Sequence, residues 1–439
     1  MSAPLPEKAL SFRHGVHPPE QKHSTEKCPI ERAHFVEEYV LPLSQHLGAP
    51  SKPAVQPGQR VQRGQLIATP GGYVSTSLHA PVAGTVKAVE LRPHPSGKLQ
   101  DAIVIAADPY QSQEVRVRLE RGEPENPSEL VSRIQSAGIV GLGGAAFPTH
   151  VKLKVPEGKK VTFAILNGCE CEPYLTCDHR VMLERAPAVV RGLQLIMKAL
   201  GVSRGTIGLE KNKMDAYAAL KAIAPSNIDV VALEVKYPQG AEKMLIDAVL
   251  HREVPSGKLP LDIEVVVNNV ATAAAVTDLV DEGLPLIERA VTVTGPGIRR
   301  PANVMVPFGT PLRAVIDHCG GLLPEARQVV LGGPMMGFAQ KDLDAPVVKG
   351  TSGILVLTEP ARMVEEYACI RCGRCLEACP MFLNPSRLAY LVRVERPDAL
   401  KAQHLLDCFE CASCSFVCPS NIPLVQLMRI GKALVRKSG

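Results

Sequence analysis

A chain of 439 residues exceeds the size at which a single hydrophobic core stops growing, so roughly three or four domains are expected. A hydrophobic content of 46% with 21% charged residues describes an ordinary globular protein. The formal charge of +5 arises from 49 basic and 44 acidic residues spread along the chain. Nucleic-acid binding needs a concentrated basic surface, so we expect no nucleic-acid partner.

Neither a secretory signal nor a membrane span is predicted. Residues 1–19 contain several prolines and no apolar core, unlike a signal peptide. The most apolar stretch, residues 265–280, is too polar to cross a bilayer. The polar side chains that interrupt it are Asn268, Asn269, Thr272, Thr277 and Asp278.

The first two predicted regions are an irregular leader at residues 1–40, which contains Cys28, and a β-rich unit at residues 41–108. In this unit, short β-branched stretches alternate with glycine and proline turns, which favours a compact sandwich. The unit resembles the barrel-sandwich hybrid of biotinyl and lipoyl carrier domains. Those carriers present a lysine between their two halves, but no lysine lies between Gln65 and Val86. We therefore expect a structural or docking module.

From about residue 128, the spacing of apolar residues changes from two to between three and four, and strand and helix patterns then alternate. Such alternation indicates a parallel sheet wrapped by helices, in an α/β domain at residues 128–285. Strands are expected at 161–166, 206–209, 229–235 and 263–267, and helices at 130–137, 189–200, 214–223, 241–250 and 271–280.

A glycine-rich stretch at residues 141–148 matches the pattern G-x-G-x-x-A. A dinucleotide fingerprint follows a strand and opens a helix, whereas this stretch follows a predicted helix and precedes a predicted strand. The Rossmann interpretation therefore fails. A glycine loop still lets a flat or anionic ligand approach the backbone closely, so we favour a binding loop over a flexible connector.

Polar residues follow two of the predicted strands. Asn268 and Asn269 lie where a strand ends and a helix begins, and with Thr272 they are candidates for binding phosphate, although asparagines there are often simple helix caps. Residues 167–178 follow another strand and hold two carboxylates, Glu170 and Glu172, that could bind a ribose or a nicotinamide. The same segment holds three thiols in a spacing that fits no familiar cluster: Cys169, Cys171 and Cys177.

Three further regions complete the chain. Short strands and glycine turns between residues 291 and 321, leading into a helix at 312–319, predict a β-grasp unit at residues 286–345. A dicluster domain is expected at 360–425, followed by a tail at 426–439. The 28 residues between Cys379 and Cys408 include a predicted helix at 385–393 and favour a helical dicluster domain over a compact β-type ferredoxin.

Eight of the thirteen cysteines form two copies of the run C-x2-C-x2-C-x3-C-P. This is the ligand run of two-cluster ferredoxins, in which the first three thiolates of a run bind one cluster and the fourth binds the other. Zinc sites usually come as separated C-x2-C pairs, and a disulfide framework needs an oxidising compartment, so both alternatives are weaker. The expected ligands are Cys369, Cys372, Cys375 and Cys418 for one 4Fe-4S cluster, and Cys408, Cys411, Cys414 and Cys379 for the second.

Four segments, at residues 141–152, 167–173, 237–242 and 268–272, together resemble the flavin- and NADH-binding subunit of respiratory complex I in order and spacing. The resemblance implies that the glycine loop and the Asn268 segment bind FMN. It also implies that Phe147, Glu172 and Glu242 face NADH. Cofactor-binding residues expected on this basis are Gly141, Gly143, Gly144, Phe147, Lys152, Asn167, Glu170, Glu172, Tyr237, Gly240, Glu242, Asn268, Asn269 and Thr272.

The chain departs from that protein at two positions of the loop, where Leu142 replaces an arginine and Ala146 replaces the usual glycine. The complex I protein also has one C-terminal cluster, whereas this chain has ligands for two. The order barrel-sandwich, flavin domain, β-grasp unit and dicluster domain resembles the RnfC family of the Rnf electron-transport complex over nearly the whole chain.

The Rnf resemblance implies a peripheral subunit on the cytoplasmic face of the bacterial inner membrane, with a cluster-rich ferredoxin-like protein of the same complex as partner. It implies electron transfer between NAD(H) and ferredoxin or flavodoxin, coupled to ion translocation. Since bound cofactors transfer the hydride, no catalytic side chain is expected. Two alternatives stay open: a soluble cobalamin reductase with related flavin and cluster domains, and an electron-carrying scaffold without flavin.

Overall fold

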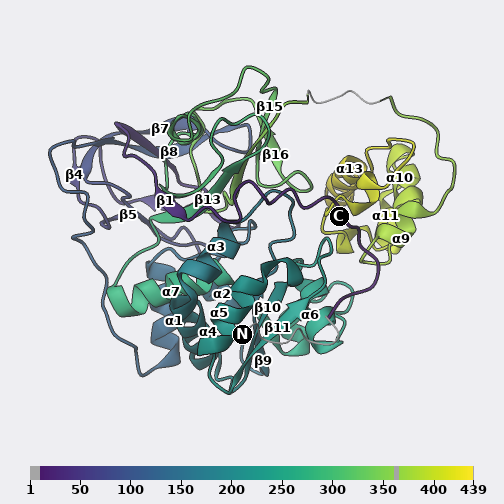
Figure 1. Cartoon of the computed structure of the whole chain (residues 1–439), viewed down its shortest axis with the longest axis horizontal. Coiled ribbons are helices and arrows are strands. Elements are labelled where there is room, and N and C mark those ends of the chain that lie inside the picture. The colour runs from purple at the N-terminus through teal and green to yellow at the C-terminus, as the bar shows by residue number, and fades with distance from the viewer. Residues whose placement is uncertain (1–9, 360–364, 439) are drawn as a thin grey trace.

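The computed structural model describes residues 10–359 and 365–438, and it combines a β-sandwich, an α/β domain, a mixed β-sheet and a small helical domain (Figure 1). The helical domain, yellow in Figure 1, lies to one side of the others. The multidomain α/β fold class predicted from the sequence is confirmed. Within the described residues, no helix combines the length and the apolar character that crossing a bilayer requires.

The β-sandwich consists of two antiparallel sheets with the strand orders β2-β8-β7-β4 and β3-β5-β6. Side chains of both sheets, such as Tyr39, Ile67 and Ile103, are fully buried. This arrangement matches the expected barrel-sandwich. The strands are β2 (Glu38–Pro42), β3 (Lys52–Pro53), β4 (Arg60–Val61), β5 (Leu66–Thr69), β6 (Leu78–His79), β7 (Gly84–Pro93) and β8 (Leu99–Ala107).

The α/β domain has a parallel sheet in the order β11-β10-β9-β12, so the carboxyl ends of all its strands meet at one edge. Its strands are β9 (Phe163–Gly168), β10 (Gly205–Glu210), β11 (Ile228–Leu233) and β12 (Val265–Asn269). Its helices are α1 (Pro127–Ser136), α2 (Thr149–Leu153), α3 (Cys177–Glu184), α4 (Ala186–Leu200), α5 (Met214–Ile223), α6 (Glu242–Leu250) and α7 (Val270–Glu282), with 3-10 turns η1 (Lys211–Lys213) and η2 (Pro260–Ile263).

Helices α4 and α7 lie unusually close, and a glycine makes this possible. A β-carbon added to Gly192 of α4 would lie 2.0 Å from the carbonyl oxygen of Ala273 in α7. Only glycine therefore fits at this crossing. The close packing fixes α7, whose N-terminus lies at the carboxyl edge of the sheet.

The mixed sheet has the order β1-β14-β13-β17-β15-β16 and packs against helix α8. Its elements are β1 (Ile30–Arg32), β13 (Glu288–Thr294), β14 (Ala302–Pro307), α8 (Leu312–His318), β15 (Gln328–Leu331), β16 (Phe338–Gln340) and β17 (Gly353–Leu357). The sheet therefore takes in strands on both sides of the expected range 286–345. The leader, expected to be irregular, supplies β1, because a three-residue strand paired with a strand far along the chain leaves no local pattern.

The helical domain contains α9 (Arg374–Ala378), α10 (Pro385–Arg393), α11 (Pro397–Ala402), η3 (Leu405–Asp407), α12 (Ser413–Phe416) and α13 (Leu424–Lys437). It has its own hydrophobic core, in which Leu388 of α10 and Met428 of α13 are buried. The expected tail is thus mostly helix α13. The helix predicted at 385–393 is confirmed as α10, which Pro385 begins and the Asn384 side chain caps.

In the α/β domain, one local expectation is wrong and one helix was not predicted. The glycine loop precedes helix α2 and not a strand, because a five-residue helix that starts at Pro148-Thr149 is too short to show a helical period. Helix α3 was missed, because its N-terminal amides are capped from outside its own sequence by Glu170.

Lys349, in the connection between β16 and β17, joins three regions of the fold. Its side chain is fully buried, and its ammonium group donates to the carbonyl oxygens of Gly138 at 2.6 Å and Ser77 at 3.0 Å. Burial lowers the pKa of Lys349 to about 7. One side chain of the mixed sheet therefore holds together the β-sandwich and the α/β domain.

Candidate functional site

The glycine loop folds back on itself at the carboxyl edge of the parallel sheet. The amide of Gly141 donates to the carbonyl of Phe147 at 2.8 Å and closes the loop, and the amide of Leu142 donates to the Thr272 hydroxyl at 2.9 Å. Gly144 has a φ of +108°, and a β-carbon added there would meet no atom within 4 Å. The loop thus presents bare backbone to open space beside the start of α7.

The junction of β12 and α7 separates the roles of two adjacent asparagines. The Asn269 side-chain oxygen accepts from the amides of Ala271 and Thr272 and caps α7, and its nitrogen donates to Asp178 at 2.6 Å. The Asn268 side-chain nitrogen is buried and has no hydrogen-bond partner within the described residues. A buried donor without a partner is costly, so this atom fits a site whose ligand supplies an acceptor.

Arg289 of strand β13, in the mixed sheet, contacts the glycine loop. This buried guanidinium donates to the carbonyl of Leu142 at 3.0 Å and to that of Lys349 at 2.6 Å. A positive charge therefore supports the loop at the residue where the complex I protein has its own arginine. Sequence reasoning missed Arg289, because nothing near it in the chain marks it as part of this site.

Ala146 occupies a backbone conformation that favours glycine, with a φ of +48°. Its methyl group is buried and points toward Gly350, where an added β-carbon would lie 3.4 Å away. The extra methyl is thus accommodated by a glycine of the mixed sheet's connection, and not on the open side of Gly144.

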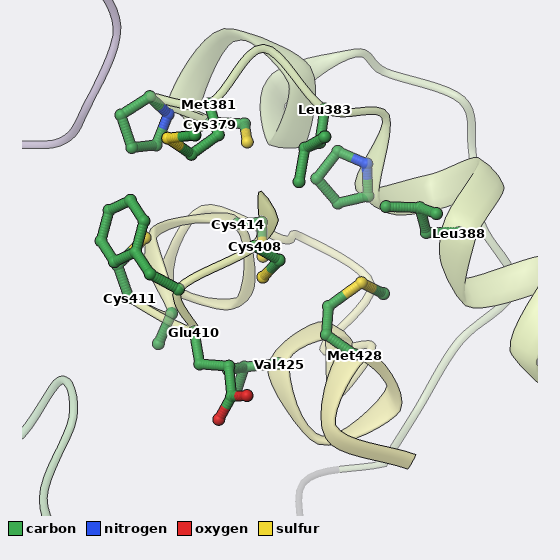
Figure 2. Close-up of a pocket in the computed structure, with 14 residues that line it drawn as sticks. Cys379, Met381, Leu383, Leu388, Cys408, Glu410, Cys411, Cys414, Val425 and Met428 are labelled. Atoms are coloured by element: carbon green, nitrogen blue, oxygen red, sulfur yellow. The ribbon is translucent and has the colours of Figure 1, made fainter. Parts of the chain in front are cut away.

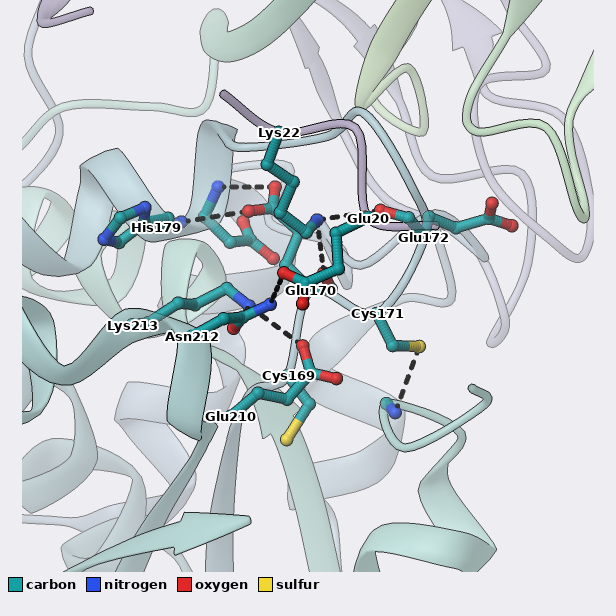
Figure 3. Close-up of polar contacts among 12 residues, drawn as sticks. Glu20, Lys22, Cys169, Glu170, Cys171, Glu172, His179, Glu210, Asn212 and Lys213 are labelled. Carbon is teal, nitrogen blue, oxygen red and sulfur yellow. Dashed lines mark hydrogen bonds and ion pairs between the residues drawn. The ribbon is translucent and has the colours of Figure 1, made fainter. Parts of the chain in front are cut away.

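Glu170 was expected to bind a ligand, but in this structure its side chain binds backbone amides of the protein. Its carboxylate accepts from the amides of Asp178 at 2.9 Å and His179 at 3.2 Å, at the N-terminus of α3 (Figure 3). Burial, with a contribution from the Glu170 charge, raises the pKa of Asp178 to about 7. One oxygen of Asp178 is buried without a partner among the described residues, beside Asn269.

Lys22 of the leader anchors the loop that follows β9. Its buried ammonium donates to the carbonyls of Glu170 at 2.7 Å, Glu172 at 2.8 Å and Leu175 at 2.6 Å (Figure 3). Burial lowers the pKa of Lys22. Sequence reasoning gave this lysine no role, because a single lysine in a leader has no distinguishing pattern.

Glu172 lies against the mixed sheet. Its carboxylate accepts from the amides of Met335 at 3.1 Å and Met336 at 2.8 Å. Burial raises the pKa of Glu172 to about 7, although these two hydrogen bonds act in the opposite direction. The expected contact of Glu172 with a nucleotide stays a prediction, and such a contact would compete with these amides.

The other candidates at the sheet edge contact one another. Lys152 donates to Glu242 at 2.6 Å and to the carbonyl of Val267 at 3.0 Å. The Asn167 side chain donates to the carbonyl of Gly240 at 2.7 Å. A β-carbon on Gly240 would lie 2.3 Å from the carbonyl oxygen of Cys169, so this close approach requires glycine. Phe147 is half-buried. The sequence-predicted candidates from four separate segments therefore meet along one edge.

The three thiols of residues 169–177 point in different directions. Cys169 lies beside the carbonyl of Gly208, and Cys171 accepts from the amide of Gly240 at 3.3 Å (Figure 3). Cys177 lies against Glu170. Cys177 forms a buried group with Glu170 and Asp178, but the Glu170 oxygens are already engaged by helix amides. The thiols do not converge on a common point.

Four cysteines from both C-terminal runs line a single apolar pocket (Figure 2). Cys379 of the first run faces the other three across the pocket, and the apolar side chains of Leu383, Leu388, Val425 and Met428 complete its wall. The three cysteines of the second run are Cys408, Cys411 and Cys414. This grouping matches the crossed ligand set expected for one cluster.

The other four cysteines differ from one another in exposure. Cys369 and Cys372 are exposed, whereas Cys375 and Cys418 are half-buried. Burial raises the pKa of Cys375, and the nearby Cys418 sulfur adds to the increase. We call the four cysteines of the pocket the enclosed group, and the other four, of which Cys369 and Cys372 are exposed, the exposed group.

The enclosed cysteine group faces the α/β domain through Tyr237. This side chain is buried, and its hydroxyl donates to the carbonyl of Cys411 at 2.8 Å. Cys171 and Met335 pack around the same contact. Tyr237, expected at a cofactor, therefore joins the sheet edge to the cysteine pocket. The helical domain makes a second contact with the α/β domain at Asp407, whose carboxylate accepts from the amide of Gly257 at 3.0 Å.

Comparisons with known families agree with this division of the chain. Residues 10–110 match the RnfC barrel sandwich hybrid domain, and residues 134–278 match the Nuo51 FMN-binding domain. Residues 290–339 match the SLBB domain, and residues 365–422 match the 4Fe-4S dicluster domain. FMN-binding and 4Fe-4S domains are therefore both present.

Curated relatives match almost the full chain. The C subunit of the proton-translocating ferredoxin:NAD(+) oxidoreductase complex of Clostridium ljungdahlii is 48% identical over 434 residues, covering 98% of this chain and 95% of the relative. The C subunit of the Na(+)-translocating complex of Acetobacterium woodii is 46% identical, covering 96% of each. The C subunit of the ion-translocating oxidoreductase complex of Rhodobacter capsulatus is 42% identical, covering 97% of this chain and 83% of the relative.

Among solved structures, the NAD+-reducing [NiFe]-hydrogenase in its air-oxidized state contains a similar chain. The TM-score is 0.51 at 19% identity, and the match covers 71% of this chain and 63% of that one. At this identity the likeness concerns the fold alone, and it agrees with the α/β architecture described above.

Proposed function

The chain belongs to the RnfC family of ion-translocating oxidoreductase complexes, and on this premise we propose that it exchanges electrons between NAD(H) and the rest of such a complex. As a subunit of an ion-translocating ferredoxin:NAD oxidoreductase it is part of an enzyme. The observation that carries the proposal is the contact of Tyr237 with Cys411, which puts a cysteine pocket against the edge where the flavin-site residues meet.

FMN is proposed to bind at the glycine loop and the start of α7. Bound there, FMN supplies hydride exchange with a nicotinamide and single-electron exchange with iron–sulfur clusters. The bare backbone of Gly144 leaves room for a ligand, and the buried Asn268 side-chain nitrogen is a donor without an acceptor in the described part of the chain. The N-terminus of α7 favours an anionic group. The protein's part is to bind, orient and shield, so no acid or nucleophile is needed.

NADH is proposed as the substrate at the same edge, with Phe147, Glu172 and Glu242 facing it. Glu172 and Glu242 are each engaged with protein groups. Exchanging these partners for hydroxyl or amide donors of a nucleotide keeps both carboxylates hydrogen-bonded, so the exchange costs little. Lys152, now paired with Glu242, would then be free to attract a phosphate.

Two 4Fe-4S clusters are proposed, with the crossed ligand sets predicted from the two runs. The enclosed set lines one pocket, and it is the set that lies behind Tyr237. In the other set, Cys369 and Cys372 are exposed at the surface. We therefore assign the enclosed cluster to exchange with the flavin and the exposed cluster to exchange with a partner.

The partner is proposed to be a cluster-rich ferredoxin-like protein of a membrane complex, with this chain on the cytoplasmic face of the bacterial inner membrane. Exposed Cys369 and Cys372, with Ile370 69% exposed between them, support an intermolecular contact there. Weak electron-transfer contacts are typically small, so a modest surface suffices.

The test is anaerobic reconstitution of the full chain with iron, sulfide and FMN, followed by addition of NADH. Bleaching of both the flavin and the iron–sulfur absorbance is expected. Failure of FMN to bind the reconstituted protein would overturn the proposal in favour of an electron-carrying scaffold. Flavin and cluster reduction without association with the other membrane proteins of such a complex would favour a soluble reductase of the cobalamin type.

A further inference from the structure

The segment of residues 10–22, here called the N-terminal strap, is fixed to the α/β domain along its length, most clearly at Leu10, Val16 and Lys22. Leu10 exchanges backbone hydrogen bonds with β11, donating to Ala232 at 3.2 Å and accepting from Glu234 at 2.9 Å. Val16 and Tyr237 donate to each other's carbonyls at 2.8 and 2.9 Å. Lys22 donates to three carbonyls of the loop after β9. The strap thus belongs structurally to the sheet edge.

The same strap also touches the helical domain. The His14 ring nitrogen Nδ1 lies 3.1 Å from the carbonyl oxygen of Leu376, and the rings of His14 and Phe382 have centroids 4.6 Å apart. Val16 packs with Tyr237 and Ala378 in a small buried cluster. Leu376, Ala378 and Phe382 flank Cys379, so the strap contacts the segment that contributes the crossed ligand of the enclosed cysteine pocket.

Local backbone geometry turns the strap toward the helical domain at one point. His14 and Gly15 have φ values of +64° and +86°. A β-carbon on Gly15 would lie 2.7 Å from the carbonyl oxygen of Tyr237, so this position requires glycine. The bend lets Val16 remain paired with Tyr237 while His14 reaches Leu376. In Figure 1 the purple segment accordingly runs beside the yellow domain.

The covalent connection cannot fix the helical domain by itself. Tyr367 and Ala368 already hydrogen-bond to Ser420 of the helical domain, so the connection from the end of β17 at Leu357 is the seven residues 358–364. A chain of this length spans up to about 25 Å when extended, so it permits more than one placement of the domain that follows. Noncovalent contacts must therefore select one placement. The strap acts on the Cys379 side, whereas Gly257 and Ser256 hold Asp407 on the Cys408 side.

We propose that the N-terminal strap is a positioning element that holds the dicluster domain with its enclosed cluster against Tyr237, and that His14 and Val16 are its positioning residues. The strap's mechanical role stands on geometry alone. Its consequence for electron transfer rests on the proposed function. Loss of the strap contact is predicted to slow flavin-to-cluster transfer while leaving NADH-to-flavin transfer and both clusters intact.

The experiment compares His14→Ala with two matched variants in the full, reconstituted chain. His17→Ala removes a second histidine of the strap, whose ring contacts Val235 of the α/β domain at 3.0 Å. His14→Asn retains a side-chain N–H donor near the position of Nδ1. Hydrogen–deuterium exchange of residues 376–382 reports docking without any cofactor turnover, and stopped-flow absorbance separates flavin reduction from cluster reduction.

For His14→Ala we expect exchange at residues 376–382 to rise about tenfold, with a similar slowing of cluster reduction, since one lost contact shifts a local opening equilibrium by that order. His17→Ala should match the wild type, and His14→Asn should recover most of the loss. Val16→Asp, which puts a charge into the buried cluster, should give a larger effect in the same direction.

Unchanged exchange and unchanged cluster reduction in both His14→Ala and Val16→Asp would overturn the strap proposal. An equal effect in His17→Ala together with no recovery in His14→Asn would remove His14 as a positioning residue, because any loss in the strap would then act alike. If the wild type fails to bind FMN or NADH, the proposed function fails instead, and the exchange measurement still decides the role of the strap.

Discussion

The dicluster domain and the flavin site are built in opposite ways. All eight cysteines proposed as ligands in the first come from one stretch of chain that has its own core. The proposed flavin site combines the glycine loop, the start of α7, Arg289 of the mixed sheet and the loop that Lys22 anchors. Substituting a single cysteine should therefore disrupt only the cluster that this cysteine binds. Cofactor binding at the flavin site should instead respond to substitutions far from the cofactor.

The largest expected effect tests how local the cluster sites are. Cys379→Ser should lose the enclosed cluster, and about half of the bound iron, although Cys379 lies in the first run. The paramagnetic signal of the reduced variant should match that of Cys408→Ser and differ from that of Cys375→Ser. Cys319→Ser, which changes a buried thiol at the end of α8, should keep all the iron. A match with Cys375→Ser would refute the crossed assignment.

The next effect distinguishes the adjacent asparagines of the flavin site. Asn268→Leu should weaken FMN binding about tenfold to a hundredfold, because the cofactor loses a buried donor. It should not lower the melting temperature of the apoprotein, because the lost nitrogen has no protein partner in the described structure. Asn269→Leu removes the α7 cap and should cost about 1 kcal/mol of stability. Titration calorimetry and thermal melts measure both, and a destabilised Asn268→Leu apoprotein would contradict the assignment.

A smaller effect is expected where the two regions meet. Tyr237→Phe removes the hydrogen bond to Cys411, a loss of about 1 kcal/mol, and should slow flavin-to-cluster transfer roughly fivefold. NADH-to-flavin transfer should be unaffected. Tyr217→Phe, on α5 against the core of the α/β domain, is the matched control. Equal cluster-reduction rates in all three proteins would show that this contact has no part in electron transfer.

The smallest expected effect is a change in how steeply the melting temperature depends on pH. With a pKa raised from 4.5 to about 7, Glu172 stays protonated in the folded chain where the unfolded chain has released its proton. Its stabilising contribution is therefore complete below about pH 4.5 and is lost as the pH rises through about 7. Glu172→Gln cannot titrate, so its melting temperature should fall less than that of the wild type over this range.

Glu172→Gln also tests the nucleotide site. We expect slower reduction of the flavin by NADH with both clusters still assembled. An unchanged rate would remove Glu172 from the nucleotide site and leave it with its structural contact to Met335 and Met336.

Features carried by short-range spacing could be predicted from the sequence. The cysteine runs, helix α10 and the alternation of the α/β domain each lie within one segment, where ligand spacing or hydrophobic period is visible. The resemblance in four segments also located the residues that meet at the sheet edge. Their contacts with FMN and NADH stay predictions.

Features made by pairing distant segments could not be predicted. Strand β1 is three residues long and pairs with β14, and Lys22 binds carbonyls that follow it by about 150 residues. Glu170 caps a helix that begins seven residues later, so its acidic side chain suggested a ligand instead. In each case the stabilising partner lies outside any window in which a sequence pattern is visible.

The buried ammonium of Lys349 has a consequence for modular engineering. Lys349 binds carbonyls of both the β-sandwich and the α/β domain, and these two parts share one continuous core. Exchanging either part alone would therefore leave the buried ammonium without some of its hydrogen-bond partners. The C-terminal segment has a separate core. A chimera that grafts a relative's electron-carrying module should therefore place its junction between Leu357 and Cys369, with the first 22 residues taken from the same donor.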